Sequence, residues 1–325
     1  MGSLSFDRIV THNDFDGMAS AALLLYIKPG AEILFSAPLK IQNNETSVRA
    51  TDAVCDLPYP LRCAAWFDHH PGNLMELKLR KIDPLTVPGS FAPERSCARV
   101  VYNFLEPGGL PEYFSSLAAA ADMIDSFAYE DVGDWRRPMP GKLIDRAVSA
   151  AEKGPGERNA FMRRMIHLMS RGSLADAAAD PEVSALSGAY SLEEERMLKI
   201  IAGKISFLPE DAGEEMVILD FTGFSRKPDV RKHLALLKKP GAGAVLEVSC
   251  RHEAGVKTNN LLFSMCLGFP RKGPDLGGIM RALNMGDGHS GAAAGRLNCS
   301  SKKEMLARKA SVLKAIFRHW RDSQR

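Results

Sequence analysis

The sequence predicts an α/β protein with an N-terminal domain built on an open parallel sheet and a smaller C-terminal α/β domain. First, the chain has 325 residues, about twice the size of a usual single domain. Second, short apolar runs in the first 70 residues alternate with polar turns and an Ala/Leu-rich stretch. This pattern is typical of buried parallel strands joined by crossover helices. Third, a similar alternation of strand and helix patterns returns after residue 211.

In the N-terminal part of the sequence, strand patterns come first and helix patterns predominate later. The expected strands are residues 8–11, 32–36, 53–55 and 63–67, and the expected helices are residues 17–27, 96–105, 112–126, 142–153 and 157–171. Residues 173–188 are rich in Ala, Asp, Ser and Gly and predict a loop or loose linker. Ser191 and Glu194 form a capping-box pattern, which predicts that a linker helix begins there.

The C-terminal part predicts a second α/β unit. Its expected strands are residues 216–221 and 244–250, and its expected helices are residues 229–237, 275–283 and 302–321. The domain boundaries that follow are 1–188 for the N-terminal domain, 189–210 for the linker helix and 211–325 for the C-terminal domain.

Composition narrows the functional class. The formal net charge of +3 is too small for a surface that coats nucleic acid, so any such contact would be local. The six cysteines are scattered without a Cys-x-x-Cys pair, which argues against a zinc ribbon or a disulfide framework. We see no signal peptide and no run of about 18 apolar residues, so we expect a cytoplasmic location and no membrane partner.

Acidic and histidine side chains follow three of the four N-terminal strands. They are His12, Asp14 and Asp16 after the first strand, Asp56 after the third, and Asp68, His69 and His70 after the fourth. One such Asp is usually a helix cap, but the whole set at successive strand ends is poorly explained by capping. Because ligands of open α/β sheets bind outside the carboxyl ends of the strands, we expect these groups to share one crevice. Oxygen and imidazole donors favour Mn²⁺ or Mg²⁺ over structural zinc.

Two further signals lie outside these strands. The Ala-rich helix at residues 112–126 carries Asp122 and Asp125 on one face, and we prefer Asp122 as a further ligand because it directly follows the alanine run. The glycine-rich turn with Gly288 and His289 predicts close backbone approach to a phosphate, ahead of a helix that would add N–H donors. Arg251 would join that anion site if its strand adjoins the turn; an exposed ion pair is the alternative.

Together these motifs resemble the DHH phosphoesterase superfamily. His12-x-Asp14-x-Asp16-Gly17 is similar to its first motif, Asp56 to its second, Asp68-His69-His70 to its third and Asp122 to its fourth. Gly288-His289 with the alanines that follow resembles the Gly-Gly-His signature of the DHH-associated C-terminal domain, although Asp287 stands where that signature has a glycine. The resemblance covers nearly the whole chain.

The resemblance implies a role for each matched residue. The implied metal ligands are His12, Asp14, Asp16, Asp56, His69 and Asp122, with Asp56 bridging two ions. Manganese is the cation that the resemblance implies, and magnesium is the other choice. Asp68 would orient its neighbours, and His70 would face the scissile phosphate and protonate the leaving oxygen. Arg251, Gly288 and His289 would hold substrate phosphate. Whether His12 binds metal directly, and whether Asp122 or Asp125 is the ligand, stays open.

The expected activity is hydrolysis of phosphoester bonds by water activated between two cations. Short oligonucleotides or small nucleotides are the preferred substrates, because the resemblance is to members that carry this C-terminal domain. The alternatives are an exopolyphosphatase or inorganic pyrophosphatase, and a non-catalytic nucleotide-binding regulator. The sequence leaves the physiological substrate, the cleavage polarity and the oligomeric state open, a homodimer included.

Overall fold

The computed structural model describes residues 4–151, 155–269 and 275–324. Its contacts divide the chain into two compact units. Unit 1 comprises Met1–Ser126 and Pro138–Ser191, and unit 2 comprises Phe127–Arg137 and Leu192–Arg325. The division falls inside one long helix, α10 (Pro181–Ala202). The sequence did not predict that residues 127–137 belong to the second unit.

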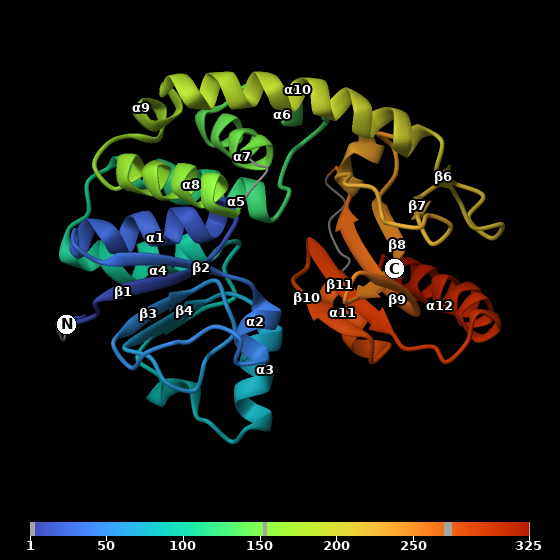
Figure 1. Ribbon diagram of the computed structural model, residues 1–325, viewed down its shortest axis with the longest axis horizontal. Helices are drawn as coiled ribbons and strands as arrows, with labels where there is room; N and C mark the ends of the chain where they lie inside the picture. The colour runs from blue at the N-terminus through green and yellow to red at the C-terminus, as the bar shows by residue number, and fades with distance from the viewer. Residues whose placement is uncertain (1–3, 152–154, 270–274, 325) are drawn as a thin grey trace. The chain divides into compact units, whose positions relative to one another are not determined.

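Unit 1 is built on a five-stranded parallel sheet, which confirms the predicted fold class (Figure 1). The strands are β1 (Arg8–His12), β2 (Glu32–Ser36), β3 (Asp52–Cys55), β4 (Ala65–Asp68) and β5 (Gly89–Phe91), in the order β2-β1-β3-β4-β5. After β2 the chain returns to the other side of β1, so the carboxyl ends of β1 and β3 are neighbours at a switch point of the topology. Ligands of open α/β sheets bind at such a point.

Helices cover both faces of this sheet (Figure 1). One face carries α1 (Phe15–Ile27), α4 (Cys97–Leu105), α5 (Tyr113–Asp125), α7 (Pro140–Ala150), α8 (Pro155–Met169) and α9 (Leu174–Ala178). The other face, with Val10, Val54 and Trp66, packs on α2 (Pro38–Gln42) and α3 (Pro71–Leu79). Short 3₁₀ turns lie at Pro84–Thr86 and Glu106–Gly108. Helix α1 is buried nearly all round because it packs against the sheet and against α4, α5 and α8.

The turn between β1 and α1 is tight, and it sets the position of the predicted ligands. Asp14 caps α1, since its side chain accepts a hydrogen bond from Gly17 N–H at 2.9 Å. Thr11 closes the turn by donating its hydroxyl proton to the Gly17 carbonyl at 2.8 Å. A Cβ at Gly17 would lie 2.3 Å from the His12 carbonyl oxygen, so only glycine fits there.

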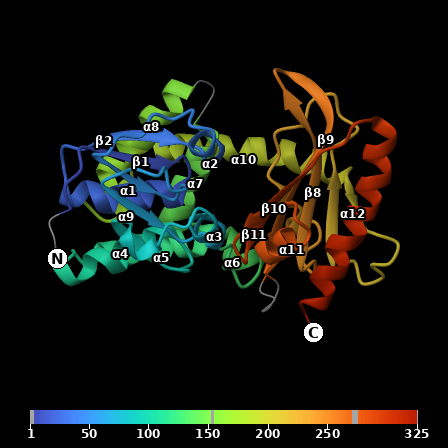
Figure 2. The ribbon, with the colours of Figure 1, turned by 90° about the horizontal axis from the view of Figure 1, so that it is seen from below.

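Unit 2 contains a six-stranded mixed sheet (Figure 2). The strands, in the order β10-β11-β9-β8-β7-β6, are β10 (Gly286–Gly288), β11 (Ala292–Leu297), β9 (Val256–Leu267), β8 (Ala244–Glu253), β7 (Met216–Asp220) and β6 (Ile205–Ser206). Only β7 and β8 pair in parallel among these described strands. Helices α11 (Leu276–Ala282) and α12 (Lys302–Asp322) pack against the sheet and form a core with it, in which Trp320 is fully buried. Helix α6 (Val132–Arg136) also belongs to this unit.

Several local predictions differ from the structure. The expected helix at residues 229–237 is a 3₁₀ helix, η3 (Lys232–Leu237), and residues 173–188 are largely helical rather than a loop. Ser191 does not begin a helix, because α10 already runs through it and its hydroxyl bonds the Ser187 carbonyl one turn back. Strand β9 was not predicted; it follows β8 through a two-residue turn at Ala254 and Gly255, both at positive φ.

None of the helices within the described ranges combines the length and the apolar character needed to cross a membrane.

We expect Gly17→Ala to lower the free energy of unfolding by about 2 kcal/mol or more, because the added Cβ collides with backbone. Gly188→Ala is the matched control. Gly188 lies exposed within α10, and a Cβ added there would meet no atom within 4 Å, so alanine should stabilise by up to about 1 kcal/mol. Chemical denaturation of both variants measures the difference; equal effects would contradict the tight-turn account.

Candidate metal centre

Carboxylates and imidazoles from four segments of unit 1 converge at the switch point of the sheet. Their ligand atoms form three overlapping groups, and within each group the atoms lie within 4.8 Å of one another. The groups are His12, Asp14 and Asp56; Asp56, His69 and His70; and Asp16, His69 and Asp125. Asp56 and His69 each belong to two groups, so the three form one continuous centre.

Asp56 occupies the middle of this centre. Its Oδ2 lies 3.4 Å from His12 Nδ1, and its Oδ1 lies 3.7 Å from both His69 Nε2 and His70 Nδ1. The two oxygens of one carboxylate therefore face different partners. The residue has φ of 56°, a left-handed conformation that Asp tolerates, and its N–H donates to the Phe67 carbonyl at 3.0 Å. The backbone thus holds Asp56 in place between the strand ends.

One half of the centre pairs His12 with Asp14. His12 Nδ1 lies 2.6 Å from Asp14 Oδ2. Burial favours the neutral ring, but the charges of Asp14 and Asp56 outweigh burial and raise the pKa of His12 to about 11. Burial also opposes ionisation of Asp14, yet the His12 charge prevails and lowers the pKa of Asp14 to about 2. Without a cation, a protonated His12 supplies the positive charge between Asp14 and Asp56.

The other half of the centre contains Asp16, which is almost completely buried. Its two oxygens accept hydrogen bonds from the N–H groups of Cys97 and Ala98, at 2.7 and 2.8 Å. These are the first N–H groups of α4, so the positive end of that helix fixes the carboxylate. Burial, together with the charges of Asp56 and Asp125, still raises the pKa of Asp16 well above its usual value.

His69 and Asp125 complete this half. His69 Nε2 lies 3.7 Å from Asp16 Oδ2 and 3.7 Å from Asp125 Oδ2. The ring contacts the Glu94 carbonyl through Nδ1 at 3.2 Å, which directs Nε2 toward the acids, an arrangement common behind metal-binding histidines. Burial and the neighbouring His70 lower the pKa of His69. Burial, with Asp56 and Asp14, raises the pKa of Asp125 well above its usual value.

Asp68 orients His70 rather than joining the metal groups. His70 Nδ1 lies 2.9 Å from Asp68 Oδ1, while Asp68 Oδ2 accepts from the Asn73 amide at 2.7 Å. Burial lowers the pKa of His70, but Asp68 and Asp56 outweigh it and raise the pKa to about 10. The sequence did not predict Asn73; its place in the first turn of the helix after His70 was the available signal.

The structure favours Asp125 over Asp122, the residue that the sequence favoured. Asp122 accepts two hydrogen bonds from the Arg99 guanidinium, at 2.9 and 2.7 Å, and one from the Ser96 hydroxyl at 2.7 Å. This carboxylate is neutralised by Arg99, whose Nε and Nη2 both donate to Oδ2, and it braces α5 against α4. Asp125 lies one turn further along α5 and reaches His69 instead.

The donor set fits divalent cations. Two like charges about 4 Å apart near a protein surface repel by about 4 kcal/mol, and four carboxylates meet here. The donors are carboxylate oxygens and imidazole nitrogens without thiolate, which suits Mn²⁺ or Mg²⁺. Cys55 and Cys97 lie nearby, but burial raises the pKa of both thiols well above the usual value.

In unit 2, the glycine-rich segment forms a β-hairpin, β10–β11, and not the expected turn into a helix. A Cβ at Gly288 would lie 2.3 Å from the Ala292 carbonyl oxygen, so hairpin packing alone explains this glycine. Asp287, which replaces the glycine of the resembled signature, pairs with Arg281 at 2.5 Å. His289 is half-buried, and its Nδ1 accepts from Gly291 N–H at 3.1 Å.

Arg251 does not join His289, contrary to the expectation from sequence. Strand β8 pairs with β7 and β9, so it does not adjoin the β10–β11 hairpin. The His289 turn lies beside Leu267, which pairs with Ala244 at the start of β8. Seven residues along a strand separate Ala244 from Arg251, a distance of about 20 Å. The side chain of Arg251 is 44% exposed and its Nε lies 3.4 Å from Glu253 Oε1, which matches the ion-pair alternative.

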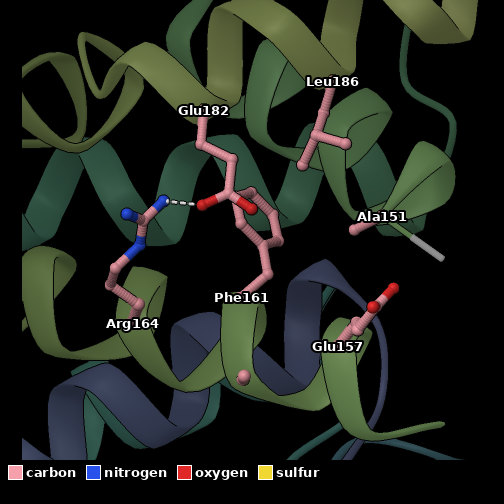
Figure 3. A pocket seen from close by; sticks show the side chains of 7 residues that line it. Ala151, Glu157, Phe161, Arg164, Glu182 and Leu186 are labelled. Atoms are coloured by element: carbon pink, nitrogen blue, oxygen red, sulfur yellow. Dashed lines mark hydrogen bonds and ion pairs between the residues drawn. The ribbon is translucent and has the colours of Figure 1, made fainter. Parts of the chain in front are cut away.

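A cavity of about 480 Å³ lies elsewhere in unit 1, among α7, α8 and α10 (Figure 3). Its lining residues are Ala151, Glu157, Ala160, Phe161, Arg164, Glu182 and Leu186. Arg164 is paired with both Asp180 and Glu182, so the main charge in the wall is already neutralised. None of the metal-centre residues lines this cavity, and we do not assign it to the site.

Comparisons with solved structures agree with the fold. The pGpG-specific phosphodiesterase PggH from Vibrio cholerae superposes with a TM-score of 0.65 at 19% identity, over 95% of this chain and 98% of that one. RecJ in complex with Mn²⁺ from Thermus thermophilus superposes with a TM-score of 0.50 at 17% identity, over 96% of this chain and 52% of that one. No protein-family model matches the chain. No curated protein matches its sequence. The chain shares the fold of these two structures.

We expect Asp125→Asn to reduce Mn²⁺ binding sharply, because it removes a charged oxygen from the centre. The matched variant Asp122→Asn should keep Mn²⁺ binding but lose about 1–2 kcal/mol of stability, since Arg99 loses its partner. Titration calorimetry with Mn²⁺ and chemical denaturation separate the two effects. Loss of Mn²⁺ binding in Asp122→Asn alone would reverse the assignment.

We expect Mn²⁺ binding to tighten as pH rises. Asp16, Asp125 and His12 all have folded-state pKa values above those of the unfolded chain. Their contribution to stability is therefore present at low pH and lost as pH rises through the raised values. A cation displaces these protons and removes the repulsion that replaces them. Thermal unfolding with and without Mn²⁺ should show a larger stabilisation at alkaline than at acidic pH; a shift independent of pH would contradict the account.

Proposed function

We propose that the protein is a metal-dependent phosphohydrolase that uses Mn²⁺ and hydrolyses phosphoester bonds of short oligonucleotides or small nucleotides. The observation that carries this proposal is Asp56, whose two oxygens face the two halves of one acidic and imidazole centre. A single carboxylate placed in this way suits two neighbouring cations.

The ligand sets follow from the two halves. His12, Asp14 and Asp56 would hold one ion. Asp16, Asp56, His69 and Asp125 would hold the other. Two bound divalent cations supply charge that neutralises phosphoryl oxygens and lowers the pKa of an attacking water.

The chain's own contribution to proton transfer falls to His70. Asp68 fixes the ring through Nδ1, and the charges of Asp68 and Asp56 outweigh burial and raise the pKa of His70 to about 10. A protonated imidazole beside the ligands has the properties of a general acid for the leaving oxygen. We further propose that His289 of unit 2 contacts substrate phosphate; Arg251 is not retained in this role.

The substrate class is supported by the likeness to a pGpG-specific phosphodiesterase along nearly the whole length of both chains. The choice of Mn²⁺ is supported by the donor set and by the Mn²⁺ complex of RecJ, which has the same fold.

The direct test is a panel of pGpG, phosphoadenosine phosphate, pyrophosphate and polyphosphate with Mn²⁺. We expect the dinucleotide or the small nucleotide to be hydrolysed and chelation to stop the reaction. Asp56→Asn should remove activity, because it removes an oxygen shared by both halves. His70→Gln should lower kcat about 10²- to 10⁴-fold while Mn²⁺ still binds.

Asp7→Asn, which changes an exposed carboxylate outside the centre, is the control and should be silent. Cleavage of polyphosphate alone would replace the proposed substrate by a phosphoanhydride. Binding of nucleotide without turnover of any substrate would indicate a regulator.

A further inference from the structure

Unit 2 carries a group of aromatic rings that contact one another. Rings of Phe127, Trp135, His233 and Phe269, which we call the aromatic group, come from three distant chain segments. Phe127 lies 5.3 Å from Trp135, 5.7 Å from His233 and 5.8 Å from Phe269, measured between ring centroids. Trp135 also contacts His233 at 5.3 Å and Phe269 at 6.0 Å.

The aromatic group is part of the surface. All four residues are half-buried, whereas the core aromatic residues Phe263 and Trp320 of the same unit are 1% and 0% exposed. Tyr129 is 3% exposed and packs edge-on against Phe127 at 5.1 Å. The group therefore combines a buried ring behind it with four partly exposed aromatic residues, and an accessible aromatic face can stack on a base.

The backbone at Phe127 is held in a costly conformation. Its φ is 51°, in the left-handed region that a bulky residue rarely adopts. Such strain persists where the surroundings fix it, and it is concentrated at functional positions. One residue, Ser126, separates Phe127 from Asp125 of the metal centre, so the aromatic group begins directly after a proposed ligand in the chain.

The charges around the aromatic group suit a nucleotide. Arg231 and Lys232 lie beside His233. Burial, and then these two cations, lower the pKa of His233 well below its usual value, so the ring is neutral at physiological pH. A neutral flat ring can stack on a base, while the adjacent Lys232 favours its phosphate.

We propose that the aromatic group is a nucleobase-stacking site that selects nucleotides over inorganic polyphosphates. This inference rests on the proposed function, because it names what distinguishes the substrate at the same enzyme. Alanine substitutions elsewhere assign about 1–3 kcal/mol to each stacked base, enough for selection by affinity.

Tryptophan fluorescence tests the site without catalysis. Trp66 and Trp320 are 1% and 0% exposed, so Trp135 is the half-buried reporter among the three tryptophans. In EDTA, where hydrolysis is stopped, pGpG should quench its emission. An abasic analogue with the same sugars and phosphates, and pyrophosphate, should not. Phe269→Leu, which keeps apolar bulk and loses the flat ring, should weaken the quenching titration about 5- to 100-fold.

Kinetics with Mn²⁺ separate stacking from a purely structural role. Phe269→Leu should raise KM for pGpG about 5- to 100-fold and leave hydrolysis of the abasic analogue unchanged. Tyr26→Leu, which alters a ring 38% exposed in unit 1, should change neither. Equal losses for both substrates, or absence of quenching, would overturn the stacking site. Quenching by pGpG in a protein that hydrolyses nothing would instead overturn the proposed function and leave the stacking site in place.

Discussion

The mutual repulsion of buried carboxylates at the switch point of the unit 1 sheet is the constraint on which the rest of this account depends. Asp16 and Asp56 are 3% exposed and cannot relax into solvent. Part of this repulsive free energy is offset by the raised pKa values of His12 and His70, which favour positive charge on both rings. The N-terminus of α4 offsets a further part, because its N–H groups donate hydrogen bonds to Asp16. The negative charge that remains is better compensated by divalent cations than by protons, because one cation binds several oxygen donors at once.

The surrounding structure serves to hold these groups at fixed positions. Gly17 allows α1 to start against β1, and Asp122 braces α5 so that Asp125 projects one turn beyond it. Backbone donors and acceptors, not mobile side chains, orient Asp16 and His69. These fixed positions explain why carboxylates that repel one another remain close together.

Much of unit 1 was predictable because buried parallel strands have a recognisable pattern in the sequence. Their apolar runs are bounded by turns, and each ligand motif follows a strand directly, as Asp56 and Asp68 do. The choice between Asp122 and Asp125 was not predictable, since both lie on one helix face and the distant Ser96 and Arg99 distinguish them. In unit 2, the sequence has no strong turn signal before β9. The order of the strands in the sheet, which separates Arg251 from His289, depends on tertiary pairing. The aromatic group was likewise invisible, because its rings come from segments far apart in sequence.

The central claim is that two cations share Asp56. The most direct measurement is a crystal structure of the Mn²⁺-soaked protein with anomalous diffraction recorded at the manganese edge. The account predicts two manganese peaks in unit 1, one among His12, Asp14 and Asp56, the other among Asp16, His69 and Asp125, with Asp56 touching both. No manganese peak among these side chains, or a single peak without contact to Asp56, would contradict it.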